Sequence, residues 1–403
     1  MRLSRIVTAT ALTAAFLIAI CPSVCAQMQY KETDLHNLGG GATDSGLTMD
    51  QFGNLYGVAD TFFELSPNGS AGWNYTDLGS GLVYAYGPMV MDKAGNFYTS
   101  NYWASVVEYS PDGSGGFTSS TIYVLDGLAS NLIIDGAGNL YAIDAGAGLY
   151  GFGYVAELSP IAGGGWSLTD LYDFRGKNGA VGAGVDDGIV GGLIMDTSGN
   201  LYGTTTAGGF STNCSGGCGV VFELTNHSGH WTEAVLHSFI GTDGSLPDAP
   251  LLMDAAGNLY GTTALGGTDG WGEVFQMPLV SGKWGFRILY NFTGAGSDGA
   301  IPEAALIMDP AGNLYGTTNS GGGYDDCIVP PASGCGTAFK LSRKGGKWEE
   351  TILHDFTGGD GAFPAGLISD AKGNLYGTTL SGGRGLGGGV VFELSPSKAG
   401  ASK

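Results

Sequence analysis

One seven-residue string, Asp-x-x-Gly-Asn-(Leu/Phe)-Tyr, recurs along the chain and constrains the fold more than any other feature. Seven copies occur, and successive copies start 42 to 61 residues apart. The copies begin at Asp50, Asp92, Asp135, Asp196, Asp254, Asp309 and Asp370. Repetition at such a period is typical of an array of similar supersecondary units.

Each copy lies within the same order of short segments rich in β-branched and aromatic residues, clearest at 306–309, 313–318, 336–341 and 348–356. Segments of this length and composition predict strands. Asp-x-x-Gly-Asn suits a tight hairpin, because Asp accepts local backbone N–H bonds and Gly adopts positive φ. A second link rich in Gly, Ser and Asn precedes each Trp, as at 282–284, and marks another hairpin. The predicted unit is a four-stranded meander.

The two ends of the chain complement each other. Residues 30–38 read like the fourth strand of a unit, since Lys31-Glu-Thr-Asp-Leu-His36 resembles Glu350-Thr-Ile-Leu-His354. Residues 390–394 read like a third strand, so the N-terminal strand can complete the last unit. We therefore predict an all-β, closed seven-bladed β-propeller, a single domain over 27–397 with a short tail at 398–403. An open β-solenoid is the alternative, but it gives no reason for the ends to match.

The core string Gly-Asn-Leu-Tyr-Gly-Thr-Thr occurs at 199–205, 257–263, 312–318 and 373–379. With the Gly-Gly and Val-Phe-Glu-Leu segments that follow, it resembles the GloVer tandem-repeat family of bacterial exported proteins. The resemblance is strong over about 191–394. It is weaker in the first three units, where Tyr98-Thr-Ser100 and Tyr141-Ala-Ile143 replace Tyr-Gly-Thr. The resemblance implies a propeller-like exported protein, and it carries over no set of catalytic residues. Members often carry a C-terminal anchoring segment, which does not appear after Pro396.

The N-terminal 26 residues have a short basic start, an apolar stretch and small residues before the predicted cleavage after Ala26. This pattern predicts a cleaved secretory signal peptide, and a secreted or periplasmic product. A lipoprotein is the alternative, but Ile20 and Val24 precede the two leader cysteines, where a small residue is needed. No later stretch approaches the roughly 20 apolar residues of a membrane span.

Four cysteines follow the leader, as two local pairs. In an oxidising compartment we expect the disulfides Cys214–Cys218 and Cys327–Cys335. A zinc site is the alternative, but no histidine lies near either pair in sequence.

Composition limits the partners. The chain contains 75 glycines and only 13% charged residues, which fits a turn-rich β protein, and its formal net charge is −21. That charge disfavours nucleic acids and anionic membranes as partners. We expect a monomer whose partner is a glycan or protein of the envelope or the extracellular space.

The candidate binding site lies on the face formed by the links between strands two and three and between strands four and one, which we call the top face. These links are long in units four to seven and short in the first two, and long loops on a rigid scaffold concentrate binding residues. The candidate residues are acidic and aromatic: Asp187, Asp243, Trp271, Asp298, Tyr324, Asp325, Asp326 and Asp360. Carboxylates could hold calcium and exposed rings could stack on sugars, although no cofactor is required by the sequence.

Structural explanations compete with this site. Asp-Gly-x-x-Pro recurs at Asp243, Asp298 and Asp360, which is what a turn of the repeat would produce. The seven motif aspartates could form a metal-binding ring, but each lies at a turn whose geometry already explains it. One strand position carries histidine in three units and tyrosine in three others, which favours a structural role: His36, His237 and His354, and Tyr123, Tyr172 and Tyr290.

No nucleophile elbow, zinc-protease helix, phosphate-binding loop or helix-loop-helix calcium loop is present. The sequence therefore favours an exported, non-catalytic propeller that binds a glycan, protein or cation through the loops of repeats four to seven. The alternative is a metal-assisted hydrolase or lyase, similar to a lactonase, at the top of the central channel. A third hypothesis is a surface scaffold without a small ligand.

Overall fold

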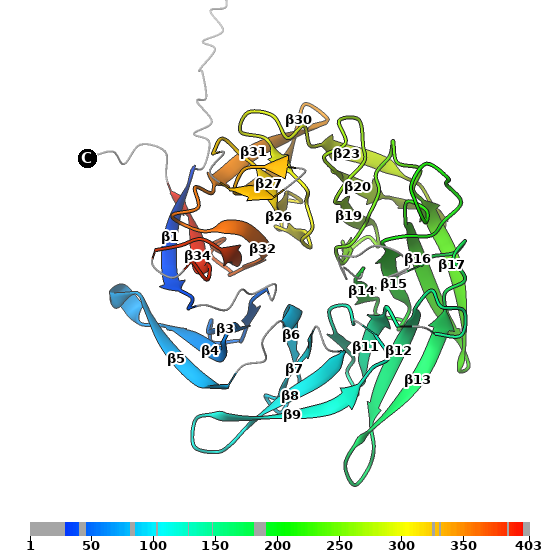
Figure 1. The fold of residues 1–403 in the computed structure, drawn as a ribbon, viewed down its shortest axis with the longest axis horizontal. Coiled ribbons are helices and arrows are strands. Elements are labelled where there is room, and N and C mark those ends of the chain that lie inside the picture. The colour runs from blue at the N-terminus through cyan, green and yellow to red at the C-terminus, as the bar shows by residue number, and fades with distance from the viewer. Residues whose placement is uncertain are drawn as a thin grey trace, which may run out of the picture.

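The computed structural model describes residues 29–39, 46–80, 85–101, 104–127, 129–146, 148–180, 191–324, 327–329, 332–384 and 387–397. The predicted signal peptide and the tail lie outside these residues. Seven four-stranded antiparallel sheets are arranged as blades around one axis (Figure 1). The fold is the seven-bladed β-propeller predicted from the repeats.

Every blade is a meander whose first strand lies nearest the axis. Blade one consists of β2 (Thr48–Met49), β3 (Leu55–Val58), β4 (Thr61–Pro67) and β5 (Trp73–Ser80). Blade two consists of β6 (Ala85–Met91), β7 (Phe97–Asn101), β8 (Ser105–Pro111) and β9 (Phe117–Val124). Blade three consists of β10 (Ile133–Ile134), β11 (Leu140–Asp144), β12 (Tyr154–Pro160) and β13 (Trp166–Asp173). A 3-10 turn, Gly69–Ala71, precedes β5.

Blade four consists of β14 (Leu193–Met195), β15 (Leu201–Thr205), β16 (Val220–His227) and β17 (His230–Ser238). Blade five consists of β18 (Leu252–Met253), β19 (Leu259–Thr263), β20 (Glu273–Met277) and β23 (Arg287–Asn291). Blade six consists of β25 (Ile307–Met308), β26 (Leu314–Thr318), β30 (Thr337–Lys344) and β31 (Lys347–Asp355). Three small two-stranded sheets decorate them: β21 (Leu279–Val280) with β22 (Lys283–Trp284), β24 (Gly299–Ala300) with β27 (Ser320–Gly321), and β28 (Ile328–Val329) with β29 (Ala332–Ser333).

The seventh blade joins the two ends of the chain. It consists of β32 (Ala362–Ser369), β33 (Leu375–Ser381), β34 (Val390–Ser397) and, outermost, β1 (Gln29–Asn37). The pairing between β1 and β34 runs from Gln29 opposite Ser397 to Asn37 opposite Val390, and Figure 1 shows the two strands side by side. The predicted closure by the N-terminal strand is confirmed.

The repeated Asp-x-x-Gly-Asn string forms the same hairpin turn in all seven blades. The Asp Oδ1 atom accepts hydrogen bonds from the backbone N–H groups two and four residues later, at 2.8–2.9 Å. The Asn amide donates to Oδ2 at 2.7–2.9 Å. The Gly has φ between +81° and +92°, a conformation that favours residues without a Cβ. The string is therefore a turn that is closed by its own side chains.

The glycine of the Tyr-Gly-Thr segment lies opposite a phenylalanine on the next strand, and the phenylalanine ring occupies the space that a Cβ on the glycine would need. A Cβ on Gly316 would lie 2.7 Å from Cζ of Phe339, its partner across the strands. The same Gly–Phe pair occurs in blades one, four, five and seven. Blade two instead pairs Thr99 with Val107, and blade three pairs Ala142 with Ala156. In blades two and three both residues of the pair are thus exchanged, so a larger residue at the glycine position meets a smaller partner than phenylalanine.

Hydrophobic clusters fill the spaces between successive blades. In the cluster between blades six and seven, Phe356 packs against Phe392 with ring centroids 5.1 Å apart, and both side chains are fully buried. Residues of blades six and seven together close this space, which is why a single repeat cannot fold alone. Among the residues that the structure describes, no helix is long and apolar enough to cross a membrane.

Candidate functional site

A β-bulge on the outermost strand of each blade directs one side chain towards the next blade. The fourth strand carries one extra residue opposite the third strand in all seven blades, for example Leu236 and Leu353. A bulge interrupts the alternation of side chains between the two faces of a sheet, so the side chain of the next residue points in a different direction than it would in a regular strand. In six blades that residue is the histidine or tyrosine of the repeat, which we call the interblade residue; in blade one it is Gly79.

Interblade residues contact the outermost strand of the following blade or the residue directly before it. His36 stacks on Tyr75 with ring centroids 3.9 Å apart, and His237 stacks on Phe286 at 3.8 Å. In the tyrosine version, Tyr290 Oη donates to Glu350 Oε2 at 3.0 Å. These contacts support the structural role that the histidine–tyrosine exchange indicated.

Three of the predicted ligand-binding aspartates lie beside these interblade residues. Asp243 Oδ2 lies 3.0 Å from His237 Nε2, and Asp360 Oδ2 lies 3.2 Å from His354 Nε2. Asp298 Oδ1 accepts a hydrogen bond from the Tyr290 hydroxyl at 3.3 Å.

The same carboxylates also hold their own loops. A backbone N–H at the start of the link donates to each of them: Ile240 to Asp243, Thr293 to Asp298, and Thr357 to Asp360. Burial acts to raise the pKa of Asp360, but hydrogen bonds from His354 and Thr357 outweigh it, so this pKa lies below its ordinary value. Each of the three aspartates therefore closes a turn of its own link through the backbone bond and holds the interblade residue through its side chain.

Trp271 occupies a position that disulfides occupy in the neighbouring blades. Its ring lies against Gly294, whose added Cβ would be 3.0 Å from the indole Cγ. In blades four and six the corresponding glycines, Gly241 and Gly358, face the Sγ atoms of the two predicted disulfides, both of which are present: Cys214–Cys218 and Cys327–Cys335. Trp271 therefore packs a top-face link onto its neighbouring link.

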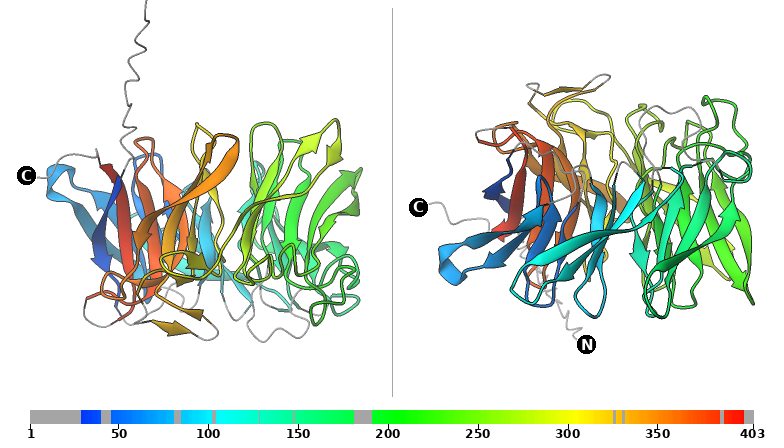
Figure 2. Two further views of the ribbon diagram at one scale, coloured as in Figure 1. Left: turned by 90° about the horizontal axis from the view of Figure 1, so that it is seen from above. Right: turned by 60° about the horizontal axis from the view of Figure 1, so that its bottom comes forward.

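Tyr324 differs from these residues, because its side chain is 45% exposed on a top-face link of blade six. The β28–β29 hairpin follows it and projects from the same face (Figure 2). The candidates Asp187, Asp325 and Asp326 lie outside the described residues. The structure thus brings the described candidates to one face, but as separate turns of successive blades.

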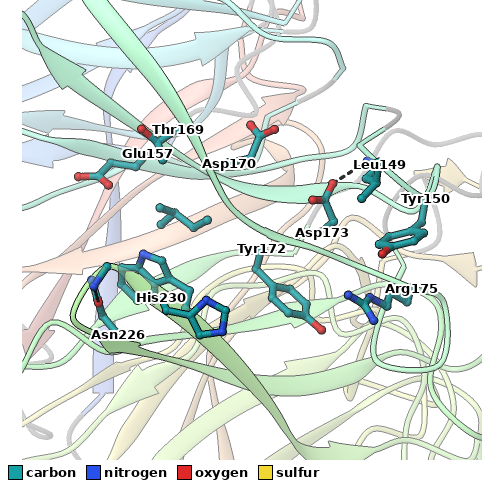
Figure 3. A pocket seen from close by; sticks show the side chains of 13 residues that line it. Leu149, Tyr150, Glu157, Thr169, Asp170, Tyr172, Asp173, Arg175, Asn226 and His230 are labelled. Carbon is teal, nitrogen blue, oxygen red and sulfur yellow. Dashed lines mark hydrogen bonds between the residues drawn. The ribbon is translucent and has the colours of Figure 1, made fainter.

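A groove on the outer rim between blades three and four was not predicted. It has a volume of about 510 Å³ and lies between β13 and β17. Figure 3 shows Tyr150, Arg175 and Asp173 gathered at one end, while His230 comes from the opposite wall. The groove combines an aromatic ring, a cation and several carboxylates on a rigid frame.

The polar end of this groove is ordered by a few contacts. Asp173 Oδ1 accepts a hydrogen bond from the Leu149 N–H at 2.6 Å, which fixes the link that carries Tyr150. The Arg175 guanidinium lies over the Tyr150 ring, 4.8 Å from its centroid. Tyr150 is 45% exposed, and Arg175 forms no ion pair with any described carboxylate. Burial, with help from the nearby Asp173 charge, raises the pKa of Asp170.

A second hollow of about 560 Å³ lies between blades one and two, next to the exposed ring of Phe52. Its carboxylates, Asp50 and Asp92, are those of the repeated turns and already accept several hydrogen bonds. This hollow offers fewer polar groups to a ligand than the groove between blades three and four.

Two acidic residues ahead of the innermost strands form another unpredicted feature. Asp248 and Glu303 take the same place in successive repeats, directly after the proline of Asp-Gly-x-x-Pro. Asp248 is buried, and its Oδ1 atom has no hydrogen-bond partner among the described residues. Burial, and secondarily the charge of Glu303, raises the pKa of Asp248 well above its ordinary value. The acidic residue after the proline was visible in the sequence, although blade seven has Ala365 there.

A second buried carboxyl lies beneath the top face in blade five. Glu273 is fully buried, and neither carboxyl oxygen has a hydrogen-bond partner among the described residues. Burial, with a smaller effect of Asp243, raises its pKa to about 8. A carboxyl in this environment carries a proton near neutral pH.

Comparison with known proteins places the chain in a family. The family model for the Gloeobacter/Verrucomicrobia repeat matches residues 85–330, which is more than half of the chain. The chain belongs to the Gloeobacter/Verrucomicrobia repeat family. This match starts in blade two, so the blades with Thr99 and Ala142 in place of glycine also belong to the repeat of this family. No curated protein matches this member of the family significantly.

Solved structures similar to this Gloeobacter/Verrucomicrobia repeat protein share its fold at low identity. A streptogramin B lyase is 11% identical with a TM-score of 0.57, over 92% of this chain and 98% of the lyase. The virginiamycin B lyase of Staphylococcus aureus is 11% identical with a TM-score of 0.56, over 92% and 100%. YCF48 from Cyanidioschyzon merolae is 14% identical with a TM-score of 0.55, over 90% and 98%. These likenesses concern the fold alone.

Proposed function

We propose that this chain is an exported, non-catalytic propeller that binds a neutral glycan in the rim groove between blades three and four. The observation that carries the proposal is the exposed Tyr150 ring beside Arg175 at one end of a groove with polar walls. Sugars place their C–H faces on aromatic rings and direct their hydroxyls to planar polar groups, which this arrangement supplies. The two disulfides support an oxidising, extracytoplasmic location.

The charges of the groove favour a neutral ligand. Three carboxylates line it, Glu157, Asp170 and Asp173, against the one guanidinium of Arg175. An acidic sugar would meet more negative than positive charge, and like charges cost binding free energy. Hydroxyl groups, by contrast, donate to carboxylates and accept from the guanidinium.

The test uses residues 27–403 with disulfides intact, screened against neutral and uronic-acid oligosaccharides by calorimetry. Tyr150→Ala and Arg175→Ala should each abolish binding of a neutral oligosaccharide that the unmodified chain binds. Tyr324→Ala is the matched control, because Tyr324 and Tyr150 are equally exposed at 45%. Loss of binding in Tyr324→Ala with retention in Tyr150→Ala would move the site to the loops of repeats four to seven. Binding of no sugar would favour the scaffold hypothesis.

A second candidate function, metal-assisted hydrolysis or elimination near the axis, is favoured by the acidic pair Asp248 and Glu303. Asp248 is buried and its pKa is raised, and carboxyls of this kind are common where acid–base chemistry takes place. The expected result for an enzyme is turnover of a lactone or a cyclic ester that is abolished in Asp248→Asn and in the presence of chelator. Unchanged turnover in Asp248→Asn would remove this candidate.

A further inference from the structure

Three potential metal ligands meet where the closing strand lies beside blade six. Glu32 comes from β1, His354 from the end of β31, and Asp360 from the link after β31. One donor atom from each residue lies within 4.8 Å of the other two. His354 Nε2 and Asp360 Oδ2 are 3.2 Å apart. Tetrahedral ligands at about 2.0–2.2 Å from one zinc ion lie about 3.3–3.6 Å apart, close to the separation of the His354 and Asp360 atoms.

The surroundings of this cluster hold an excess of negative charge. Asp34 and Asp355 also act electrostatically on its members, so four carboxylates surround the imidazole of His354. Arg384 is the cation that acts on Asp34. Glu32 Oε1 and Asp34 Oδ1 are buried and have no hydrogen-bond partner among the described residues. Buried acceptors without donors are costly, and a cation bound through Glu32 would reduce this cost.

Three other blade interfaces show which contacts form at this position when the set of three ligands is incomplete. Between blades five and six, Tyr290 replaces the histidine and bonds directly to Glu350. Between blades four and five, Phe286 replaces the glutamate and stacks on His237. Between blades three and four, the triad is Tyr172, Asn178 and Glu233, and the Asn178 amide donates to Glu233 Oε2 at 3.2 Å.

Those interfaces are closed by direct contacts, whereas no direct hydrogen bond is found between Glu32 and His354 within the described part of the chain. Imidazole and carboxylate side chains together are typical zinc ligands. We propose that Glu32, His354 and Asp360 bind one zinc ion, which ties the closing strand β1 to blade six. The ion completes the contact that direct hydrogen bonds or ring stacking make at these three interfaces. The proposal is independent of the rim groove, which lies between blades three and four.

The experiment adds zinc to the chelator-stripped chain 27–403, with disulfides intact, and measures stoichiometry by calorimetry and melting temperature in parallel. We expect one saturable zinc ion per chain and a rise in melting temperature that chelator reverses, because a ligand of the folded state stabilises it. Unmodified protein that binds no zinc, or shows no such rise, would overturn the proposal.

Two substitutions locate the ion. The equivalent residues of blades three and five are Tyr172 and Tyr290, so the variant His354→Tyr should fold. This variant should lose saturable zinc binding. Glu32→Gln should lose it as well. The matched control is His237→Tyr, which changes the equivalent histidine at the interface that lacks the glutamate and should leave zinc binding unchanged. Retained binding in His354→Tyr, or loss in His237→Tyr, would show that the ion binds elsewhere.

Discussion

The indole ring of Trp271 lies directly against Gly294, at the place where the next blade has a disulfide facing Gly358. Gly294 has φ +61° and Gly358 has φ +81°, so the two links share a left-handed turn at this point. The Trp271 side chain and the Cys327–Cys335 disulfide thus pack against the equivalent glycine in successive repeats.

Trp271→Ala should therefore lower stability. Truncation of a fully buried Trp costs about 3–5 kcal/mol, and Trp271 is half-buried, so we expect about 2 kcal/mol. Urea unfolding would measure it, and sugar binding in the rim groove should be unaffected. An unchanged unfolding midpoint would contradict the packing role.

Gly316 and Phe339 should show strong coupling. Gly316→Ala places a Cβ 2.7 Å from Phe339 Cζ, and such overpacking costs about 1–3 kcal/mol. Adding Phe339→Val, as in the pair Thr99–Val107, should recover part of that loss. A double-mutant cycle in urea tests this, and purely additive effects would argue against the coupling.

Stability should fall as pH rises towards 8, because of Glu273. Its folded-state pKa of about 8 exceeds the ordinary value of 4.5, so the folded state binds this proton more tightly. The contribution is full below pH 4.5 and is lost as pH rises to about 8, at about 1.4 kcal/mol per pKa unit. Glu273→Gln should show a smaller loss between these limits in urea titrations. The pKa of Glu350 is also raised to about 8, and this group contributes equally in the unmodified chain and in Glu273→Gln. If the loss of stability between pH 4.5 and 8 is the same in Glu273→Gln as in the unmodified chain, Glu273 is not its cause.

The turn aspartates should act in the opposite direction. Burial acts to raise the pKa of Asp309, but hydrogen bonds from Asn313 and Tyr315 outweigh it and lower the pKa below 3.8. Its stabilisation is thus present above that pH and is lost as pH falls through the lowered value. Asp309→Ala should cost about 2 kcal/mol at neutral pH and less in acid. The exposed Asp269→Ala is the control and should change stability little at either pH.

The sequence was sufficient for the ring because its decisive signals are local and repeated. The Asp50 turn can be read from five adjacent residues, and its role follows from the reach of one carboxylate. Closure by β1 was also predictable, since residues 31–36 resemble an internal strand.

The rim groove could not be predicted in this way. Tyr150 and Trp231 belong to different repeats, and their distance depends on how far the outer strands of two blades diverge. The role of Trp271 was hidden for a related reason, because an aromatic residue in a glycine-rich loop gives the same pattern whether it packs inwards or binds a ligand. The partner Gly294, 23 residues later, becomes visible only in three dimensions.

The pairing of β1 with β34 has a consequence for the order of folding. Gln29 and Ser397 are 368 positions apart, and the Ser397 hydroxyl donates to the Gln29 carbonyl at 2.9 Å. A chain that emerges from a ribosome or a translocation pore with its N-terminus first must therefore keep β1 unpaired until almost the whole chain has followed. Contacts this distant in sequence form slowly, and an unpaired strand is open to pairing with other chains. The charged side chains of Lys31, Glu32 and Asp34 on this strand would keep it in solution until its partner strand has formed.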